Sequence, residues 1–313
     1  MKIIIRADSS SSIGFGHISR CLVLAKKYKR RGFKVLFACE KLEGNRINLI
    51  EEEGFKVHSL KSNNLKEFRT LVNKLNPYRV VIDSYRIDYS YEKKLKKNTK
   101  IKLLCFDDTY EKHYCDELLN HNVCAIKKRY KKLVPKFCKV KCGSKYTLLR
   151  DEFLDSTKVK IKNDNKKLKV LLAIGGTDHS FINIKVLQAL KVFQKQIKIS
   201  VITTSANKNL EKLKKYISKQ KNIELLINSN SIAQQMSKSD IAIITPSVTL
   251  NEVMYMKLPF IAIKTASNQE FMYDFLKKNK YIVLDKFIDK TVQKEFKNLI
   301  VNYKKYYNKQ VKF

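Results

Sequence analysis

The sequence predicts an α/β protein built from two doubly wound domains, and three observations support this prediction. Its 313 residues are more than a single domain usually holds. Short apolar segments alternate with amphipathic segments along the chain, as in parallel sheets covered by helices on both faces. The alternation breaks at 155–167, a charged stretch rich in Asn and Lys. We therefore predict domains over 1–154 and 155–313, facing a cleft at the carboxyl ends of their strands.

The elements expected in the first domain follow from apolar periodicity and from the glycines that end helices. The first helix has apolar residues at three- and four-residue spacing and ends at Gly32, and the second ends at Gly54. The expected strands cover 2–6, 33–39, 55–58, 79–83, 101–106 and 117–119, and the expected helices cover 17–31, 45–53 and 65–75.

The second domain repeats the same alternation after the charged stretch. Its apolar segments are short and uninterrupted, which favours buried strands of a parallel sheet. The expected strands cover 168–174, 197–203, 223–227, 241–244 and 260–263, and the expected helices cover 181–193, 210–218, 249–255, 269–278 and 292–307.

The composition is strongly basic, with 65 Lys and Arg against 29 Asp and Glu and a formal net charge of +36. Such a charge is compatible with nucleic-acid binding, in which contacts to phosphates dominate the affinity. However, the ten Arg all lie between Arg6 and Arg150, and the Lys are spread evenly instead of forming a clustered patch. We therefore expect no nucleic-acid partner, whereas an anionic small molecule fits the sign of the charge.

The seven cysteines are scattered and form no C-x-x-C pair, and the five histidines are isolated. A structural zinc site needs four converging ligands, so we expect no metal, no cofactor and no disulfide. No apolar run is long enough to cross a membrane, and a charge appears too early for a signal peptide. These features predict a soluble, cytoplasmic monomer.

A glycine-rich turn, with Gly14, Gly16 and His17, follows the first strand and opens the first helix. It does not match a dinucleotide fingerprint, because Ser19 occupies the third glycine position. The two glycines permit close approach of a ligand. The positive end of the helix disfavours the imidazolium form of His17, so that the ring can accept a proton. The alternative, a flexible turn with an incidental histidine, stays open.

Turns at the ends of other strands carry further candidates. Gly176, Thr177 and Asp178 follow the first strand of the second domain, where free amides at a helix N-terminus suit a diphosphate; a plain helix cap is the alternative. In the segment 247–252, the Glu252 carboxylate can hold ribose hydroxyls or merely pair with the helix N-terminus. Asn268 can donate to a ligand or cap the helix that follows.

Acidic residues end two strands of the first domain. Asp83 is followed two residues later by Tyr85, and Asp107 is followed by Asp108. Such positions face the ligand crevice of parallel α/β domains. The same aspartates can instead cap their own loops, orient His17 or bind polar groups of a sugar, and these alternatives stay open.

Taken together, these motifs resemble the family of UDP-sugar hydrolases of pseudaminic acid biosynthesis. The matching blocks run in the order of that family over about residues 1–284. The blocks are Asp8–Cys21, Ile82–Tyr85, Phe106–Asp108, Leu118–Asn120, Cys142–Phe153, Gly175–Asp178, Asn251–Glu252 and Asn268–Gln269.

The resemblance implies a glycosyltransferase-B-like fold, with UDP bound by the second domain and the sugar against the first. It implies metal-independent, inverting hydrolysis of a UDP-linked diacetamido-trideoxy sugar to free sugar and UDP, with His17 as the base. Tyr85 is expected to be a second catalytic residue. The expected substrate-binding residues are Gly14, Gly16, Arg20, Asp83, Asp107, Gly176, Thr177, Asp178, Ser247, Val248, Asn251, Glu252, Asn268 and Gln269.

Two other functions stay open at this point. A UDP-sugar glycosyltransferase of the same fold would use a sugar or lipid acceptor in place of water, and it would release UDP only when that acceptor is present. A basic nucleic-acid-binding protein would show salt-sensitive binding. Hydrolysis is favoured because UDP is a good leaving group, so the reaction needs only one base, an anion site and exclusion of competing acceptors.

Overall fold

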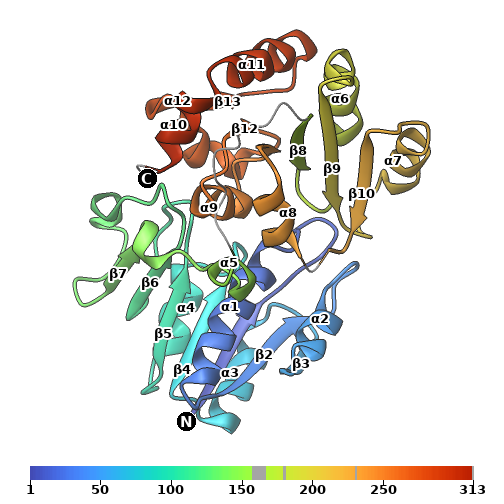
Figure 1. Ribbon diagram of the computed structural model, residues 1–313. Helices are drawn as coiled ribbons and strands as arrows, with labels where there is room; N and C mark the ends of the chain where they lie inside the picture. The colour runs from blue at the N-terminus through green and yellow to red at the C-terminus, as the bar shows by residue number, and fades with distance from the viewer. Residues whose placement is uncertain (157–166, 179–180, 230, 312–313) are drawn as a thin grey trace. The chain divides into compact units, whose positions relative to one another are not determined.

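The computed structural model describes residues 1–156, 167–178, 181–229 and 231–311 (Figure 1). The chain divides into two compact units, Met1–Leu149 (unit 1) and Arg150–Phe313 (unit 2). The short helix α5 (Asp151–Leu154) therefore belongs to unit 2, whereas the sequence placed it at the end of the first domain. Most of the charged stretch expected between the domains lies outside the described residues.

Unit 1, described in full, contains a seven-stranded parallel sheet in the order β3-β2-β1-β4-β5-β6-β7. This order places the strands that follow β1 on both sides of it, which is the doubly wound arrangement. The strands are β1 (Lys2–Ala7), β2 (Lys34–Glu40), β3 (Lys56–Leu60), β4 (Arg79–Asp83), β5 (Lys102–Phe106), β6 (Glu117–Asn120) and β7 (Lys139–Cys142). The α-helices are α1 (Gly16–Arg30), α2 (Ile47–Glu52), α3 (Leu65–Leu75) and α4 (Tyr89–Lys96).

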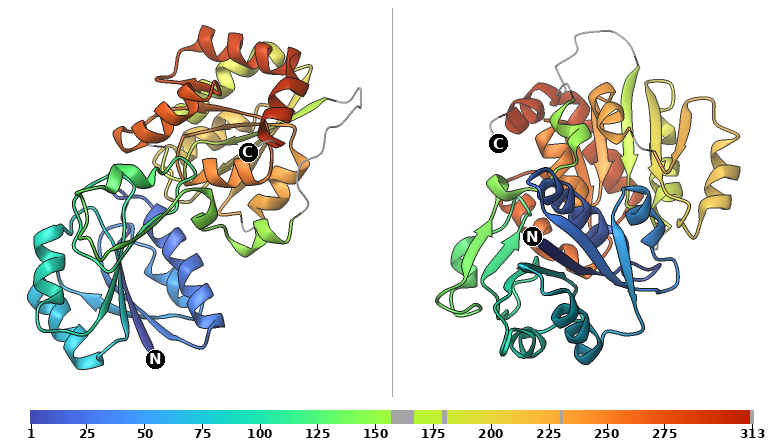
Figure 2. Two further views of the ribbon diagram at one scale, coloured as in Figure 1. Left: turned by 90° about the vertical axis from the view of Figure 1, so that its left-hand side faces the viewer. Right: turned by 90° about the horizontal axis from the view of Figure 1, so that it is seen from below.

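Burial on both faces explains the uninterrupted apolar run of β1. Ile3 and Ile5 pack on the face covered by α1, whereas Ile4 packs on the opposite face with residues of α3 and α4. The left view of Figure 2 shows these helices on the two sides of the sheet. Since successive side chains of a strand point to opposite faces, no position of β1 beyond Lys2 can remain polar without a buried partner.

Unit 2 contains a six-stranded parallel sheet among its described residues, in the order β10-β9-β8-β11-β12-β13. The strand order of unit 1 is thus repeated without its seventh strand. The strands are β8 (Leu168–Ala173), β9 (Ile197–Thr203), β10 (Ile223–Ile227), β11 (Ile241–Ile244), β12 (Phe260–Ile263) and β13 (Ile282–Leu284). The further α-helices are α6 (Ile182–Ala189), α7 (Leu210–Ile217), α8 (Ile232–Lys238), α9 (Val248–Tyr255), α10 (Glu270–Lys278), α11 (Asp289–Val301) and α12 (Tyr303–Val311).

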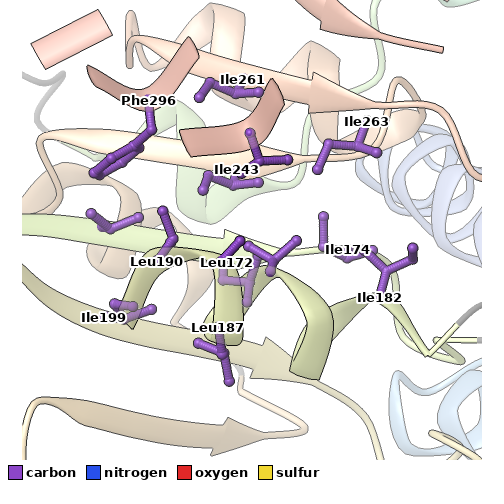
Figure 3. Close-up of a cluster of buried hydrophobic side chains, with 14 of the residues drawn as sticks. Leu172, Ile174, Ile182, Leu187, Leu190, Ile199, Ile243, Ile261, Ile263 and Phe296 are labelled. Atoms are coloured by element: carbon purple, nitrogen blue, oxygen red, sulfur yellow. The ribbon is translucent and has the colours of Figure 1, made fainter. Parts of the chain in front are cut away.

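The core of unit 2 joins its central strands to the helix α11 near the end of the chain. Figure 3 shows Phe296 of α11 among Leu190, Ile243 and Ile261. The Gln293 side chain also donates to the carbonyl oxygen of Ala189 at the end of α6, at 3.0 Å. Helix α11 is therefore an integral part of the core of unit 2.

The predicted fold class of two doubly wound parallel domains is confirmed, but several elements were not expected. Helix α4, with the sequence YSYEKKLK, has too few apolar residues for a clear helical period, and β13 has only three residues. The strand β7 and the helix α8 were also missed. The last helix, expected over 292–307, is two helices, α11 and α12. Among the described residues, the helices are all too short or too polar to span a bilayer.

We expect Phe296→Ala to lower the free energy of unfolding of unit 2 by about 3–5 kcal/mol, because it leaves a cavity among well-packed side chains. Val301→Ala on the same helix is the control, since Val301 is 73% exposed, and it should change stability by less than about 0.5 kcal/mol. Urea unfolding measures both. Equal stability of the two variants would contradict the role of α11 in the core.

Candidate functional site

The turn between β1 and α1 is held by its own hydrogen bonds. Gly14 has a φ of +82°, which only glycine adopts without strain. Its amide donates to the carbonyl oxygen of Ser10 at 2.9 Å, and the Ser10 hydroxyl accepts from the amide of Ile13 at 2.9 Å. The helix α1 then begins at Gly16, so that His17 lies in its first turn, as the sequence predicted. The His17 ring is therefore positioned by a fixed turn.

The paired ends of β1 and β4 bring His17 and Asp83 together. Ala7 pairs with Asp83, the last residue of β4. The Nδ1 atom of His17 lies 2.5 Å from Oδ1 of Asp83. One turn later in α1, Arg20 donates to both oxygens of this carboxylate at 2.6 Å. The Asp83 side chain is 1% exposed, so an imidazole and a guanidinium replace water around it.

The charge of Asp83 decides the tautomer of His17. Burial opposes ionisation of Asp83, but the Arg20 guanidinium and His17 outweigh it and hold the pKa of this carboxyl well below its usual range. An ionised carboxylate only accepts hydrogen bonds, so Nδ1 of His17 carries the proton that points to Asp83. When the ring is neutral, its lone pair is then on Nε2. This atom is the one that can accept a proton from a reactant.

Asp108 and Tyr85 complete the cluster around His17. Asp108 accepts from Arg20 at 2.6 Å and from the Tyr85 hydroxyl at 2.7 Å. The Tyr85 ring contacts the His17 ring edge-on, with 4.8 Å between centroids, and is 52% exposed. Partial desolvation of this half-exposed residue and the Asp108 charge raise the pKa of Tyr85, which keeps its hydroxyl protonated as a donor. Tyr85, predicted to be the second catalytic residue, thus lies against His17.

Three residues of unit 1 that were predicted to bind substrate, Arg20, Asp83 and Asp107, have partners inside the unit. Arg20 is buried and bound to Asp83 and Asp108. Asp107 accepts from Thr109 and Tyr110 of its own turn, and its Oδ2 also accepts from the Tyr130 hydroxyl at 2.7 Å. Of the two adjacent aspartates, Asp108 is therefore the one that contacts the His17 cluster. Asp83 contacts His17 and Asp107 contacts its own turn, while their binding of substrate stays a prediction.

Two histidines that the sequence did not single out lie behind this cluster. His121 follows β6 and is fully buried; burial and the charge of Arg20 lower its pKa to about 3, so the ring is neutral. His113 lies between Glu92 and Asp107, with Nδ1 2.7 Å from Glu92 Oε1 and Nε2 3.7 Å from Asp107 Oδ1. Burial alone would lower the pKa of His113, but the two carboxylates raise it from 6.5 to about 10.

One group of possible metal ligands exists among the described residues, namely Glu92, Cys105 and His113, all buried. The Glu92 carboxylate already accepts from His113 and from the amide of Tyr114, at 2.7 and 2.6 Å. A proton on His113 thus fills the place that a cation would take. The absence of a metal stays a prediction.

In unit 2, a residue of the turn after β8 caps the helix α6. A Cβ on Gly176 would lie 2.8 Å from Cγ2 of Thr204, so close packing there requires glycine. Asp178 accepts from the amides of Ile182 and Asn183 at 2.8 and 3.4 Å. These two amides at the start of α6 belong to the expected diphosphate site, and they already have a carboxylate partner. Asp178 is therefore a helix cap, the alternative that the sequence left open.

The turn after β11 leads into α9, where Glu252 is held by an arginine. Ser247 precedes the helix and Val248 begins it, and Asn251 and Glu252 are both buried. Burial raises the pKa of Glu252, and Arg150 offsets part of this effect through bonds of 2.9 and 3.2 Å. Arg150 also contacts Glu152 at 2.7 Å. No local pattern in the sequence indicates this role of Arg150, because its partner lies about 100 residues further along the chain.

The third turn of unit 2 follows β12. Gln269 accepts from the amide of Thr265 at 2.8 Å and so closes its own turn, while Asn268 is exposed. Because β8, β11 and β12 are adjacent and parallel, the three turns lie together at the carboxyl ends of the strands; we call this the edge of unit 2. This edge therefore gathers the candidate residues of the second domain, from Gly176 to Gln269.

Solved structures similar to this chain are glycosyltransferases and related nucleotide-sugar enzymes. MurG of Acinetobacter baumannii has 12% identity and a TM-score of 0.63, and the match covers 99% of this chain and 94% of that one. The spinosyn rhamnosyltransferase SpnG has 9% identity and a TM-score of 0.67, with 100% and 95% covered. UDP-GlcNAc 2-epimerase of Neisseria meningitidis has 14% identity and a TM-score of 0.59, with 99% and 94% covered. The fold is thus that of the glycosyltransferase-B class.

Curated relatives narrow this class to a family. The UDP-2,4-diacetamido-2,4,6-trideoxy-β-L-altropyranose hydrolase of Campylobacter jejuni is 40% identical over 283 residues, which cover 90% of this chain and 98% of the relative. The chain belongs to the family of this hydrolase. The spore coat polysaccharide biosynthesis protein SpsG of Bacillus subtilis is 22% identical over 86% of this chain and 79% of that protein. No family model matches the chain.

The buried ion pair of His113 predicts a pH-dependent stability. A histidine with a raised pKa stabilises the fold fully below its unfolded pKa, near 6.5, and the contribution is lost as the pH rises through about 10. We expect wild type to exceed His113→Gln in free energy of unfolding at pH 6 by on the order of 2–4 kcal/mol, and this difference should shrink at pH 10. Urea unfolding at both pH values measures it. A difference that grows with pH would contradict the assignment.

Proposed function

We propose that this protein hydrolyses a UDP-linked diacetamido-trideoxy sugar to free sugar and UDP, as the name of its Campylobacter jejuni relative describes. The observation that carries the proposal is the His17–Asp83 pair, because it presents one oriented base in a family of hydrolases. Incubation with candidate UDP-sugars tests it directly. UDP should be released without any added acceptor, whereas release only with a sugar or lipid acceptor would identify a glycosyltransferase.

In the proposed reaction, Nε2 of His17 takes a proton from water as the water oxygen attacks the anomeric carbon. The bond between this carbon and the diphosphate oxygen breaks, and UDP leaves with the electron pair. Asp83 stabilises the imidazolium that forms, as the buried aspartate does in hydrolytic triads. Because UDP is a good leaving group, this route needs no strong general acid. The protonated Tyr85 hydroxyl is a further donor beside the ring.

The nucleotide is proposed to bind at the edge of unit 2. Glu252 is the residue that we assign to the ribose hydroxyls, because Arg150 fixes its carboxylate one turn into α9. Gly176, Thr177 and the turns after β11 and β12 supply backbone and polar groups for the remainder of the nucleotide. We further propose a monomer that works in the cytoplasm, and the seven free cysteines suit the reducing conditions of that compartment.

His17→Ala should bind UDP as wild type does and lose about 10²–10⁴ in hydrolysis rate, since it removes the general base. His58→Ala is the matched control, because His58 is exposed on β3. UDP release and calorimetric UDP binding are the two measurements. Turnover of His17→Ala at the wild-type rate would refute the assignment.

Glu252→Ala should weaken UDP binding at least about tenfold, because hydrogen bonds to a charged group contribute roughly 1.5–3 kcal/mol. Glu224→Ala removes an equal charge from an exposed position of the same unit and should leave the affinity unchanged. Titration calorimetry measures both. An unaltered affinity of the Glu252 variant would argue against the ribose role.

The released sugar should first appear with inverted anomeric configuration. A double displacement needs a nucleophile that forms a glycosyl-enzyme. The carboxylates of Asp83 and Asp107 are buried and bound within unit 1, and Asp108 is bound by Arg20 and Tyr85. A single displacement needs only His17 to hold water on the face opposite the diphosphate. Proton NMR at early times decides the matter, and a retained anomer would show that His17 is not the residue that sets the mechanism.

A further inference from the structure

The turn after β5 has two neighbouring carboxylates with different tasks. Asp108 reaches the His17 cluster, where it accepts from Arg20 and Tyr85. Asp107, the preceding residue, holds the turn itself through the amides of Thr109 and Tyr110 at 3.0 and 2.9 Å. Any displacement of Asp107 therefore moves the backbone that carries Asp108.

His113 forms an ion pair with Asp107. Its own backbone is fixed by a hydrogen bond from its amide to the carbonyl oxygen of Leu133, at 2.9 Å. Its Nδ1 donates to Glu92 of α4 at 2.7 Å, and its Nε2 faces Asp107 at the ion-pair distance of 3.7 Å. The ring thus bridges the helix α4 and the turn after β5.

The charges around the ring require it to be a cation. Glu92 is fully buried and Asp107 is 4% exposed. The other titratable groups near the ring are the thiols of Cys105 on β5, Cys115, and Cys138 before β7, and burial raises the pKa of Cys105 to about 12. The thiols are therefore neutral. Two buried carboxylates remain, and an imidazolium is the cation beside both of them.

We propose that His113 is a positioning residue for the reaction: by holding Asp107, it keeps Asp108 on Arg20 and Tyr85 and so fixes the ring of His17. His113 touches neither His17 nor the carboxylate of Asp83, so its effect passes through the turn. The inference rests on the proposed function, because its main readout is hydrolysis of the UDP-sugar.

Two amide variants separate this role from a merely structural one. The amide nitrogen of His113→Asn falls near the position of Nδ1 and keeps the contact with Glu92, whereas that of His113→Gln falls near Nε2 and keeps the contact with Asp107. Both variants lose the charge, and both should lose stability. If His113 acts through the turn, kcat of His113→Asn falls about 10–100-fold with KM unchanged, while His113→Gln stays within about threefold of wild type.

Tyr130→Phe provides a second test that leaves the ion pair intact. The Tyr130 hydroxyl donates to Asp107 Oδ2 at 2.7 Å, and its removal loosens the same turn without a change in charge. We expect kcat to fall about tenfold with KM unchanged. This variant decides the question if His113→Asn does not fold. His58→Asn and His58→Gln on the exposed edge of β3 are the matched controls and should behave as wild type.

Equal kcat in the Asn and Gln variants, or a wild-type kcat in Tyr130→Phe, would overturn the inference. A failure of the proposed function looks different, because wild type itself would then release no UDP from any UDP-sugar. In that case, amide hydrogen exchange of Tyr110 reports on the turn without activity: it should be faster in His113→Asn than in His113→Gln, and equal rates would overturn the inference.

Discussion

The candidate site of unit 1 depends on one buried charge, the carboxylate of Asp83. A carboxylate that is 1% exposed is stable only when its oxygens are bound, and here Arg20 and His17 bind them. Loss of one partner from a buried pair typically costs about 3–5 kcal/mol, because the other charge is left without compensation. The pairing of β1 with β4 and the start of α1 at Gly16 bring Asp83 close to His17 and Arg20. The tautomer of His17 follows from it as well.

The two units share one strand order, but the turns after their strands carry different kinds of side-chain contacts. At the edge of unit 1, the turns carry an ionic cluster in which Arg20 joins Asp83 to Asp108. At the corresponding edge of unit 2, Asp178 and Gln269 bind backbone amides of their own turns. Parallel sheets of this kind place the turns after adjacent strands together, and the residues in those turns then decide whether the edge offers charges or backbone groups.

The fold was largely predictable because buried parallel strands leave a local signal. Runs such as 241–244 are apolar on both faces, and Gly32 and Gly54 mark the ends of the first two helices. The site was predictable only in part: the two glycines before His17 mark a turn, but the bond from Arg20 to Asp83 spans 63 residues and has no local signature. Likewise, nothing in the pair Asp107-Asp108 shows which carboxylate faces His17. That depends on the side of the turn to which each side chain points.

The position of Phe296 in the core has a consequence for synthesis on the ribosome. Unit 1 is complete at Leu149, so it can fold while the later residues are still being added, for on the order of ten seconds. Unit 2 cannot bury its central strands until α11 has emerged, because Phe296 packs beside Ile243 and Ile261. During that interval unit 1 is folded, while the central strands of unit 2 lack the helix α11 that packs on them.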